Sequence, residues 1–211
     1  GEGCIRGNVS HGDGVYRSSD GGKTWKHAGL ADTRHIPRVR IHPKNPDIVV
    51  ACIEHADGGI FRSEDKGETW TRMSATQHRP MYYSHLYIDP NNDLRIWLLG
   101  APMLISEDGG RTFQTDRVKR IHGDYHALWI NPKDSRHVIT GSDGGLYWSY
   151  DSGKTWDYVD TIAVGQFYEV GFDMRKPYWI YGGLQDNSNW GGPSRTFDTL
   201  GITTEGKLTA F

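Results

Sequence analysis

The sequence predicts an all-β fold, a β-propeller of four-stranded blades. Three observations support this prediction. One eight-residue pattern occurs four times, two further markers repeat in register with it, and each repeat contains short apolar segments separated by turn residues. Repeats of about 40 to 50 residues with four strands each are typical of propeller blades. The composition agrees, because 27 glycines and 12% aromatic residues suit short strands joined by tight turns.

The repeated pattern is Ser-x-Asp-x-Gly-x-Thr followed by Trp or Phe, at 18–25, 63–70, 106–113 and 149–156. An aspartate side chain accepts hydrogen bonds from backbone N–H groups in a tight turn, and glycine permits positive φ there. The pattern therefore predicts a stapled turn between the third and fourth strands of each blade. Because a catalytic residue is needed once or twice rather than in every repeat, we expect structural roles for Asp20, Asp65, Asp108 and Asp151, and for the aromatics Trp25, Trp70, Phe113 and Trp156.

The repeats divide the chain into half and whole blades. Before the first whole blade stands a half blade with only the last two strands, and after the third stands one with only the first two. The expected divisions are 1–35, 36–75, 76–118, 119–160 and 161–194, with 195–211 unassigned. The two halves either join into a small four-bladed ring or end an arc of a larger ring. We favour the arc, as a piece of a longer protein.

Charge and hydropathy exclude several classes of protein. The formal net charge of −2 argues against a phosphate-binding surface for nucleic acid. A run of 18 apolar residues, which a membrane-spanning helix needs, is absent from the sequence. Nucleotide-binding glycine loops and redox motifs are absent as well, and we expect no cofactor.

Functional residues are expected where one repeat differs from the others, at the start of the innermost strands. The third blade carries His122, Asp124 and His126, which a spacing of two places on one side of a strand. Such a triplet binds a metal through two imidazoles and a carboxylate, or supplies an acid and a base for hydrolysis. The metal is the weakest of these hypotheses. Since Leu128 and Ile130 share the same parity, a regular strand would instead turn the triplet toward the core between blades.

Two other stretches are specific to one repeat. The loop 182–194 places amides and an acid beside an aromatic ring, and the segment 80–85 carries two tyrosines and a histidine. Amides with a flat aromatic suit sugar hydroxyls and pyranose faces. The alternative for the loop is an Asn/Gly turn with an anchored tryptophan. The candidate ligand-binding residues are Tyr82, Tyr83, His85, His122, His126, Gln185, Asn187 and Trp190, and the candidate catalytic acids are Asp124 and Asp186.

The repeated pattern resembles the Asp-box, or BNR repeat, of sialidases, sortilin-type receptors and several glycosidase propellers. The segments "TRHIPRVRIHPKNPDIV", "RPMYYSHLYIDPNND", "HGDYHALWINP" and "YGGLQDNSNWGGPS" resemble a bacterial family of sortilin-like Asp-box propellers, often labelled glycosyl hydrolases. The resemblance reaches about residue 194. It implies additional blades and an extracytoplasmic location, either secreted or periplasmic.

Two related families bear on catalysis. Sialidases carry an Arg-Ile-Pro motif and an arginine triad, whereas residues 35–38 read "HIPR" and no triad can be placed, so sialidase activity is not expected. Xyloglucan-cleaving endoglucanases use two catalytic aspartates, for which Asp124 and Asp186 are the only copy-specific candidates.

Three functions follow from the sequence. The first is a binding module whose channel mouth contacts a glycan or peptide, within a larger exported protein. The second is a glycoside hydrolase, and the third is a purely structural interaction propeller. The expected partners are a glycan or peptide ligand and further blades of the same chain or a second copy, without nucleic acid or a membrane span.

Overall fold

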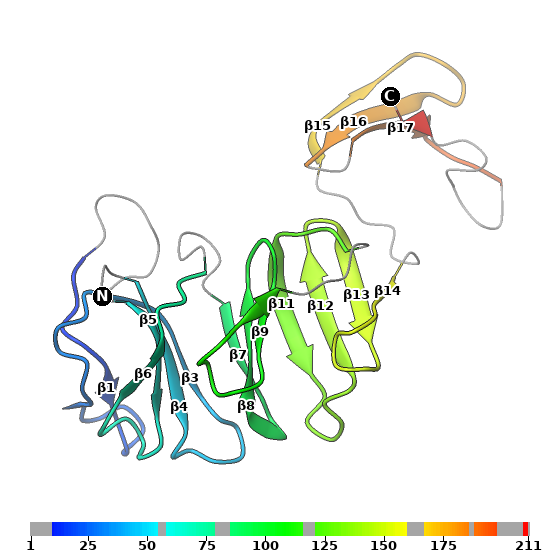
Figure 1. Ribbon diagram of the computed structural model, residues 1–211. Helices are drawn as coiled ribbons and strands as arrows, with labels where there is room; N and C mark the ends of the chain where they lie inside the picture. Colours follow the sequence, from blue (N-terminus) through cyan, green and yellow to red (C-terminus); the bar gives the residue numbers. More distant parts are fainter. Residues whose placement is uncertain are drawn as a thin grey trace. The chain divides into compact units, whose positions relative to one another are not determined.

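The computed structural model describes residues 10–54, 58–78, 85–115, 121–159, 167–185 and 188–197 and the strand 209–210. The chain divides into two compact units, Gly1–Val159 and Asp160–Phe211. Across the described residues the regular structure is entirely β, arranged as five antiparallel sheets without a helix (Figure 1). This confirms the predicted all-β class.

The first unit contains a two-stranded sheet and three four-stranded sheets in which consecutive strands are neighbours. The small sheet holds β1 (Tyr16–Arg17) and β2 (Lys26–His27), with the first Asp-box between them. The strands of the three larger sheets are β3 (His35–Ile41), β4 (Val49–Glu54), β5 (Gly59–Ser63), β6 (Thr71–Ser74), β7 (His85–Asp89), β8 (Asn92–Leu99), β9 (Leu104–Ser106), β10 (Gln114–Thr115), β11 (Tyr125–Ile130), β12 (Val138–Ser142), β13 (Gly145–Ser149) and β14 (Asp157–Tyr158). Each larger sheet has the four-stranded antiparallel order of a propeller blade.

The second unit contains one four-stranded sheet, β15 (Phe167–Phe172), β16 (Trp179–Leu184), β17 (Asn189–Pro193) and β18 (Thr209–Ala210). The sequence predicted only the first two of these strands. The segment 189–193 reads as a loop because its Gly-Gly-Pro has low β-propensity, yet it pairs with β16, with Trp190 opposite Gly182. The fourth strand comes from the stretch 195–211, which the sequence left unassigned.

Two apolar clusters lie between the blades of the first unit. Ile96 and Leu98 of β8 pack into the cluster shared with β4 and β5, whereas Trp97 and Leu99 pack into the cluster shared with β11 and β12. The middle sheet is therefore buried on both faces, which explains the uninterrupted apolar run 96–99. Burying one such side chain stabilises the fold by about 1.5–3 kcal/mol.

The apolar residues of the innermost strands are only partly buried. In the first unit Leu86, Ile88, Leu128 and Ile130 are buried in these clusters, whereas Ile41 of β3 is 61% exposed. The equivalent residues of the second unit, Val170 and Phe172, are 59% and 72% exposed. The second unit, taken by itself, is a single sheet, and burial of apolar side chains on a sheet depends on a second layer.

The four Asp-boxes share one hydrogen-bond pattern. In the second box, the Ser63 hydroxyl donates to Asp65 Oδ1 at 2.7 Å and accepts from the N–H of Gly67 at 2.8 Å. Asp65 also accepts from the N–H of Thr69 at 2.9 Å and from its hydroxyl. The same bonds recur around the other three box aspartates, Asp20, Asp108 and Asp151. Each aspartate holds a turn.

The box also fixes the distance to the preceding blade. The indole N–H of Trp70 donates to Ala28 O at 2.7 Å, across to the first hairpin, and to Gly67 O at 2.9 Å within its own turn. Phe113 packs against the cluster between the first two whole blades, and Trp156 packs against the next cluster. The box glycine is in close contact as well: a Cβ added to Gly153, at φ +82°, would lie 2.7 Å from the Trp97 ring.

We predict that Gly153→Ala destabilises the chain much more than Gly22→Ala does. Both glycines occupy the same box position with positive φ, at +82° and +87°, but a Cβ on Gly22 meets nothing nearer than Trp25 at 3.8 Å. Left-handed backbone costs alanine about 1–2 kcal/mol, and overpacking adds about 1–3 kcal/mol. Urea unfolding of the two variants measures the difference. Equal losses would show that the box glycine does not transmit packing between blades.

A second prediction concerns acid stability. Hydrogen bonds from the Thr69 side chain, the Thr69 N–H and Ser63 lower the pKa of Asp65 to about 2. Because the unfolded value is about 3.9, the ionised carboxylate stabilises the folded chain above about pH 4, and this stabilisation is lost as the pH falls toward 2. In urea unfolding, the stability difference between the wild type and Asp65→Asn should therefore shrink between pH 5 and pH 2.5. If the stability difference between the wild type and Asp65→Asn did not change with pH, the lowered pKa of Asp65 would be contradicted.

Candidate functional site

Two of the innermost strands of the first unit, β3 and β11, begin with irregular pairing. A register shift lies between His35 and Arg38 in β3, and another between Tyr125 and Ala127 in β11. Such β-bulges place two residues opposite one and redirect side chains, often next to functional sites. In β11 the extra residue is His126.

The bulge in β11 corrects the parity argument made for the triplet 122–126. A regular strand would turn His126 to the same side as Leu128. Instead Tyr125, only 2% exposed, joins Leu128 and Ile130 in the apolar cluster, and His126 makes a polar contact. Its Nε2 lies 2.8 Å from Asp143 Oδ1. Since a carboxylate only accepts, the Nε2–H of His126 is the donor.

A line of polar side chains crosses the innermost strands of the three blades. Arg38 Nη2 of β3 lies 3.3 Å from His85 Nδ1 of β7, and His126 of β11 follows with its partner Asp143. Arg40 Nε donates to Leu86 O at 3.0 Å, which ties β3 to β7. We call Arg38, Arg40, His85, His126 and Asp143 the inner-strand polar cluster. Strands β3, β7 and β11 are neighbours in space, so three blades contribute to it.

The surroundings of His85 in this cluster favour its neutral form. Burial lowers its pKa below the ordinary 6.5, and the charges of Arg38, Arg40 and His126 lower it further. A guanidinium has no acceptor, so Nδ1 of His85 must accept from Arg38. The proton of the neutral ring is then on Nε2.

A second polar pair lies at the same end of the first whole blade. His35 of β3 stands opposite Glu54 of β4 in the sheet register. His35 Nε2 and Glu54 Oε2 are buried without a hydrogen-bond partner in the described part of the chain. Burial raises the pKa of Glu54. Buried polar atoms are rarely left unpaired in a folded protein, so these two atoms are unusual among the described residues.

The other predicted site residues lie in the third blade, in the second unit or outside the described residues. His122 Nδ1 lies 3.1 Å from Gly123 O, and Asp124 has a left-handed backbone, φ 60°, with its carbonyl accepting from the Asp143 N–H at 3.3 Å. Among the described residues, no three His, Cys, Asp or Glu side chains form a metal-binding group. Gln185 and Trp190 belong to the second unit, and Tyr82, Tyr83, Asp186 and Asn187 lie outside the described residues. The carboxylate pair is therefore still a prediction.

Sequence reasoning missed the residues Arg38, Arg40, Glu54 and Asp143. The signal for the arginines was present in "RVRIHP", because the corresponding segments "HLYIDP" and "ALWINP" carry no cation. Asp143 gave no signal, since it lies in an Asp-Gly turn that alone predicts a hairpin.

Residues 13–103 match the sequence profile of the family described as Sortilin-Vps10, "Sortilin, neurotensin receptor 3". This stretch is similar to sortilin-type Asp-box blades. It is also 35% identical over 92 residues to the VPS10 domain-containing receptor SorCS3 of mouse and of human, a match that covers 40% of this chain and 7% of each receptor. The resemblance found in the sequence is thereby confirmed.

Solved structures extend the likeness to nearly the whole chain. The GH74 enzyme of Niastella koreensis matches with a TM-score of 0.60 and 15% identity, over 95% of this chain and 34% of that enzyme. The GH74 xyloglucanase of Xanthomonas campestris matches with a TM-score of 0.56 and 15% identity, over 87% of this chain and 34% of that enzyme. Similarity at this identity shows the fold alone, a partial β-propeller. The chain spans about a third of the length of these enzymes.

We predict that the imidazole pKa of His85 lies below 6.5 and rises in Arg38→Ala. The substitution opens the ring to water and removes a repelling charge, the two largest causes of the lowered pKa. NMR titration of the histidine side chains measures the shift. Arg136→Ala is the control, because Arg136 pairs with Asp134 in an exposed turn. An unchanged His85 titration in Arg38→Ala would contradict the contact.

Proposed function

We propose that this chain is an Asp-box propeller module of a larger exported protein, and that its inner-strand polar cluster binds a glycan or a peptide. The observation that carries the proposal is the alignment of donors and acceptors from three blades, Arg38, His85, His126 and Asp143, at strand starts where the repeats differ. A purely structural repeat would be expected to carry the same residues in every blade.

The chemistry of the cluster suits a ligand rich in hydroxyl or amide groups. Arg38 and the Nε2–H of His85 supply donors, and the Asp143 carboxylate supplies acceptors. Sugar hydroxyls and peptide groups both donate and accept, so they match this mixed set better than a simple ion does. The unpaired atoms of His35 and Glu54 extend the same kind of surface.

The comparisons support an extracytoplasmic module. The matched relatives are receptors by name, and the similar folds belong to GH74 enzymes, including a xyloglucanase. In the described part of the chain, no helix has the length and apolarity needed to cross a membrane. We therefore choose a xyloglucan oligosaccharide and a random peptide library as the first probes.

We predict that Arg38→Ala weakens binding of the recognised probe about tenfold or more, and that His85→Ala, which removes a neutral donor, weakens it less. Hydrogen bonds to charged groups contribute about 1.5–3 kcal/mol, and 1.4 kcal/mol corresponds to a factor of ten. Calorimetric titration with the oligosaccharide, and selection from the library followed by titration, measure the affinities. Arg136→Ala is the matched control, because it removes the same side chain from an exposed turn.

The outcomes separate the three functions. The binding module is supported if the wild type binds a probe without cleaving it and the cluster variants bind that probe more weakly. Release of reducing ends from xyloglucan by the wild type, and not by Asp124→Asn, would replace it with the glycoside hydrolase. Failure of both probe classes to bind would overturn the proposal in favour of a structural propeller.

A further inference from the structure

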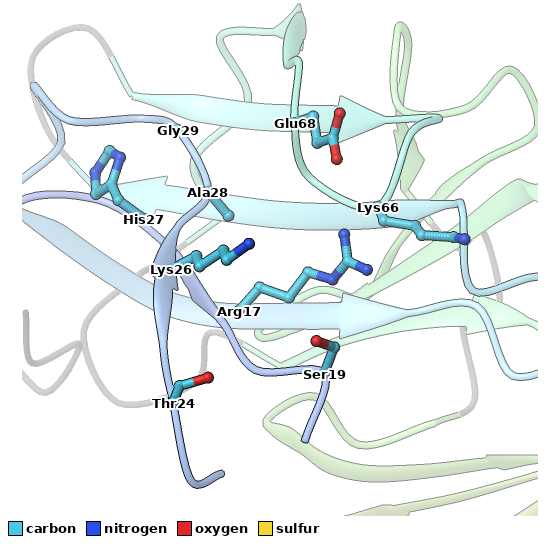
Figure 2. Close-up of a pocket in the computed structure, with 9 residues that line it drawn as sticks. All are labelled: Arg17, Ser19, Thr24, Lys26, His27, Ala28, Gly29, Lys66 and Glu68. Atoms are coloured by element: carbon cyan, nitrogen blue, oxygen red, sulfur yellow. The ribbon is translucent and has the colours of Figure 1, made fainter. Parts of the chain in front are cut away.

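A pocket of about 420 Å³ lies between the first hairpin and the second Asp-box turn. Arg17 and Lys26 contribute from β1 and β2, and Lys66 and Glu68 from the turn (Figure 2). Figure 2 shows the Arg17 and Lys26 side chains extending into the space below the turn. The pocket involves none of the innermost strands, so it is separate from the inner-strand polar cluster.

The two cations of the hairpin form a like-charge pair. Arg17 stands directly opposite Lys26 in the antiparallel register, so both side chains project from the same face. Cross-strand neighbours have Cβ atoms about 4.5–5.5 Å apart, and like charges there are destabilising. The other register pair, Tyr16 and His27, makes a favourable edge contact between rings at 5.2 Å. A repulsive pair facing a pocket indicates that an anion between the two cations offsets the repulsion.

Among the described residues, no carboxylate pairs with Arg17 or Lys26. Within the described ranges, neither Arg17 nor Lys26 takes part in an ion pair or a side-chain hydrogen bond. Lys66 Nζ lies 3.4 Å from Asp47 Oδ1, and both side chains are about half exposed, at 48% and 49%. Glu68 lines the pocket without pairing with any of the three cations. The pocket therefore holds three cations against one carboxylate.

The backbone of the pocket argues for a ligand recognised through side chains. The Ala28 N–H donates to Val15 O, Ala28 O accepts from the Trp70 indole, and Gly29 O accepts from the Val15 N–H. These groups are not available to pair with an extended peptide. The Ser19 and Thr24 hydroxyls line the wall beside the cations, an arrangement that suits a sugar carrying acidic groups.

We propose that this pocket binds the oxyanion groups, sulfate or carboxylate, of an acidic polysaccharide. Arg17 and Lys26 hold one oxyanion between them, and Lys66 contacts the ligand from the opposite wall. Charge-assisted hydrogen bonds to such oxygens are about twice as strong as neutral ones.

The test titrates the 211-residue chain with a dextran sulfate oligosaccharide and with tetragalacturonate, which separate the sulfate and carboxylate sources. At least one should bind, and its affinity should fall as NaCl rises from about 50 to 300 mM, because salt screens exposed charges. Arg17→Ala should weaken binding about tenfold, the loss expected for one charge-assisted contact. Arg17→Ala/Lys26→Ala should abolish it. Lys154→Ala is the matched control, since it removes a cation from another box turn.

A second measurement uses the repulsion itself. Lys26→Glu replaces the like-charge pair with an opposite-charge pair, so without ligand it should raise the thermal unfolding midpoint while removing polysaccharide binding. Equal affinities for wild type and double variant would overturn the proposal. A polyglutamate peptide that binds as tightly as the polysaccharides would overturn the polysaccharide assignment, and so would binding of free sulfate alone. The variants of the inner-strand polar cluster should leave this binding unchanged, which distinguishes the two sites.

Discussion

The network in which each box serine and aspartate hold one turn is the constraint on which this fold depends. The hydroxyl and the carboxylate fix the turn from inside, and the turn then presents its glycine and aromatic residue to the preceding blade. The Trp70 indole, bonded to Ala28 and to its own turn, joins the two roles in one side chain. A mobile turn could not maintain the close approach of Gly153 to Trp97. The local hydrogen bonds and the packing between blades therefore require each other.

The innermost strands face a different requirement. Where β7 and β11 pack against a neighbouring blade, Leu86, Leu128 and Ile130 are apolar and buried. The first residues of such a strand need not be apolar where a bulge turns a side chain away from the neighbouring blade, as it does at His126. The same strand thus carries an apolar packing segment and a polar segment that differs between the repeats. Function is free to diverge at the bulge without weakening the core.

The sequence was sufficient for the features that depend on short-range order. Box turns, strand positions in the whole blades and the all-β class follow from local patterns, because the serine, aspartate and threonine that hold a box turn lie within eight residues of one another. The polar cluster was only partly predictable. His85 and His126 differ from their counterparts, but the pairing of Arg38 with His85 spans 47 residues of chain, and the bulge that redirects His126 has no marker in "HGDYHALWI". Likewise β17 is a strand because β16 pairs with it, and its own residues do not favour one.

The middle blade, buried on both faces, gives the first unit a hierarchy of stability. Each blade packs only against its neighbours. The free energy needed to open a blade therefore depends on how many neighbouring blades it contacts. Opening β8 exposes Ile96 and Leu98 on one side and Trp97 and Leu99 on the other, and so dissolves both clusters together. Opening the hairpin of β1 and β2 breaks, among the described residues, its contacts with the first whole blade. Backbone amides of β8 should thus exchange with solvent only through unfolding of the whole unit, while those of the first hairpin exchange through local fraying.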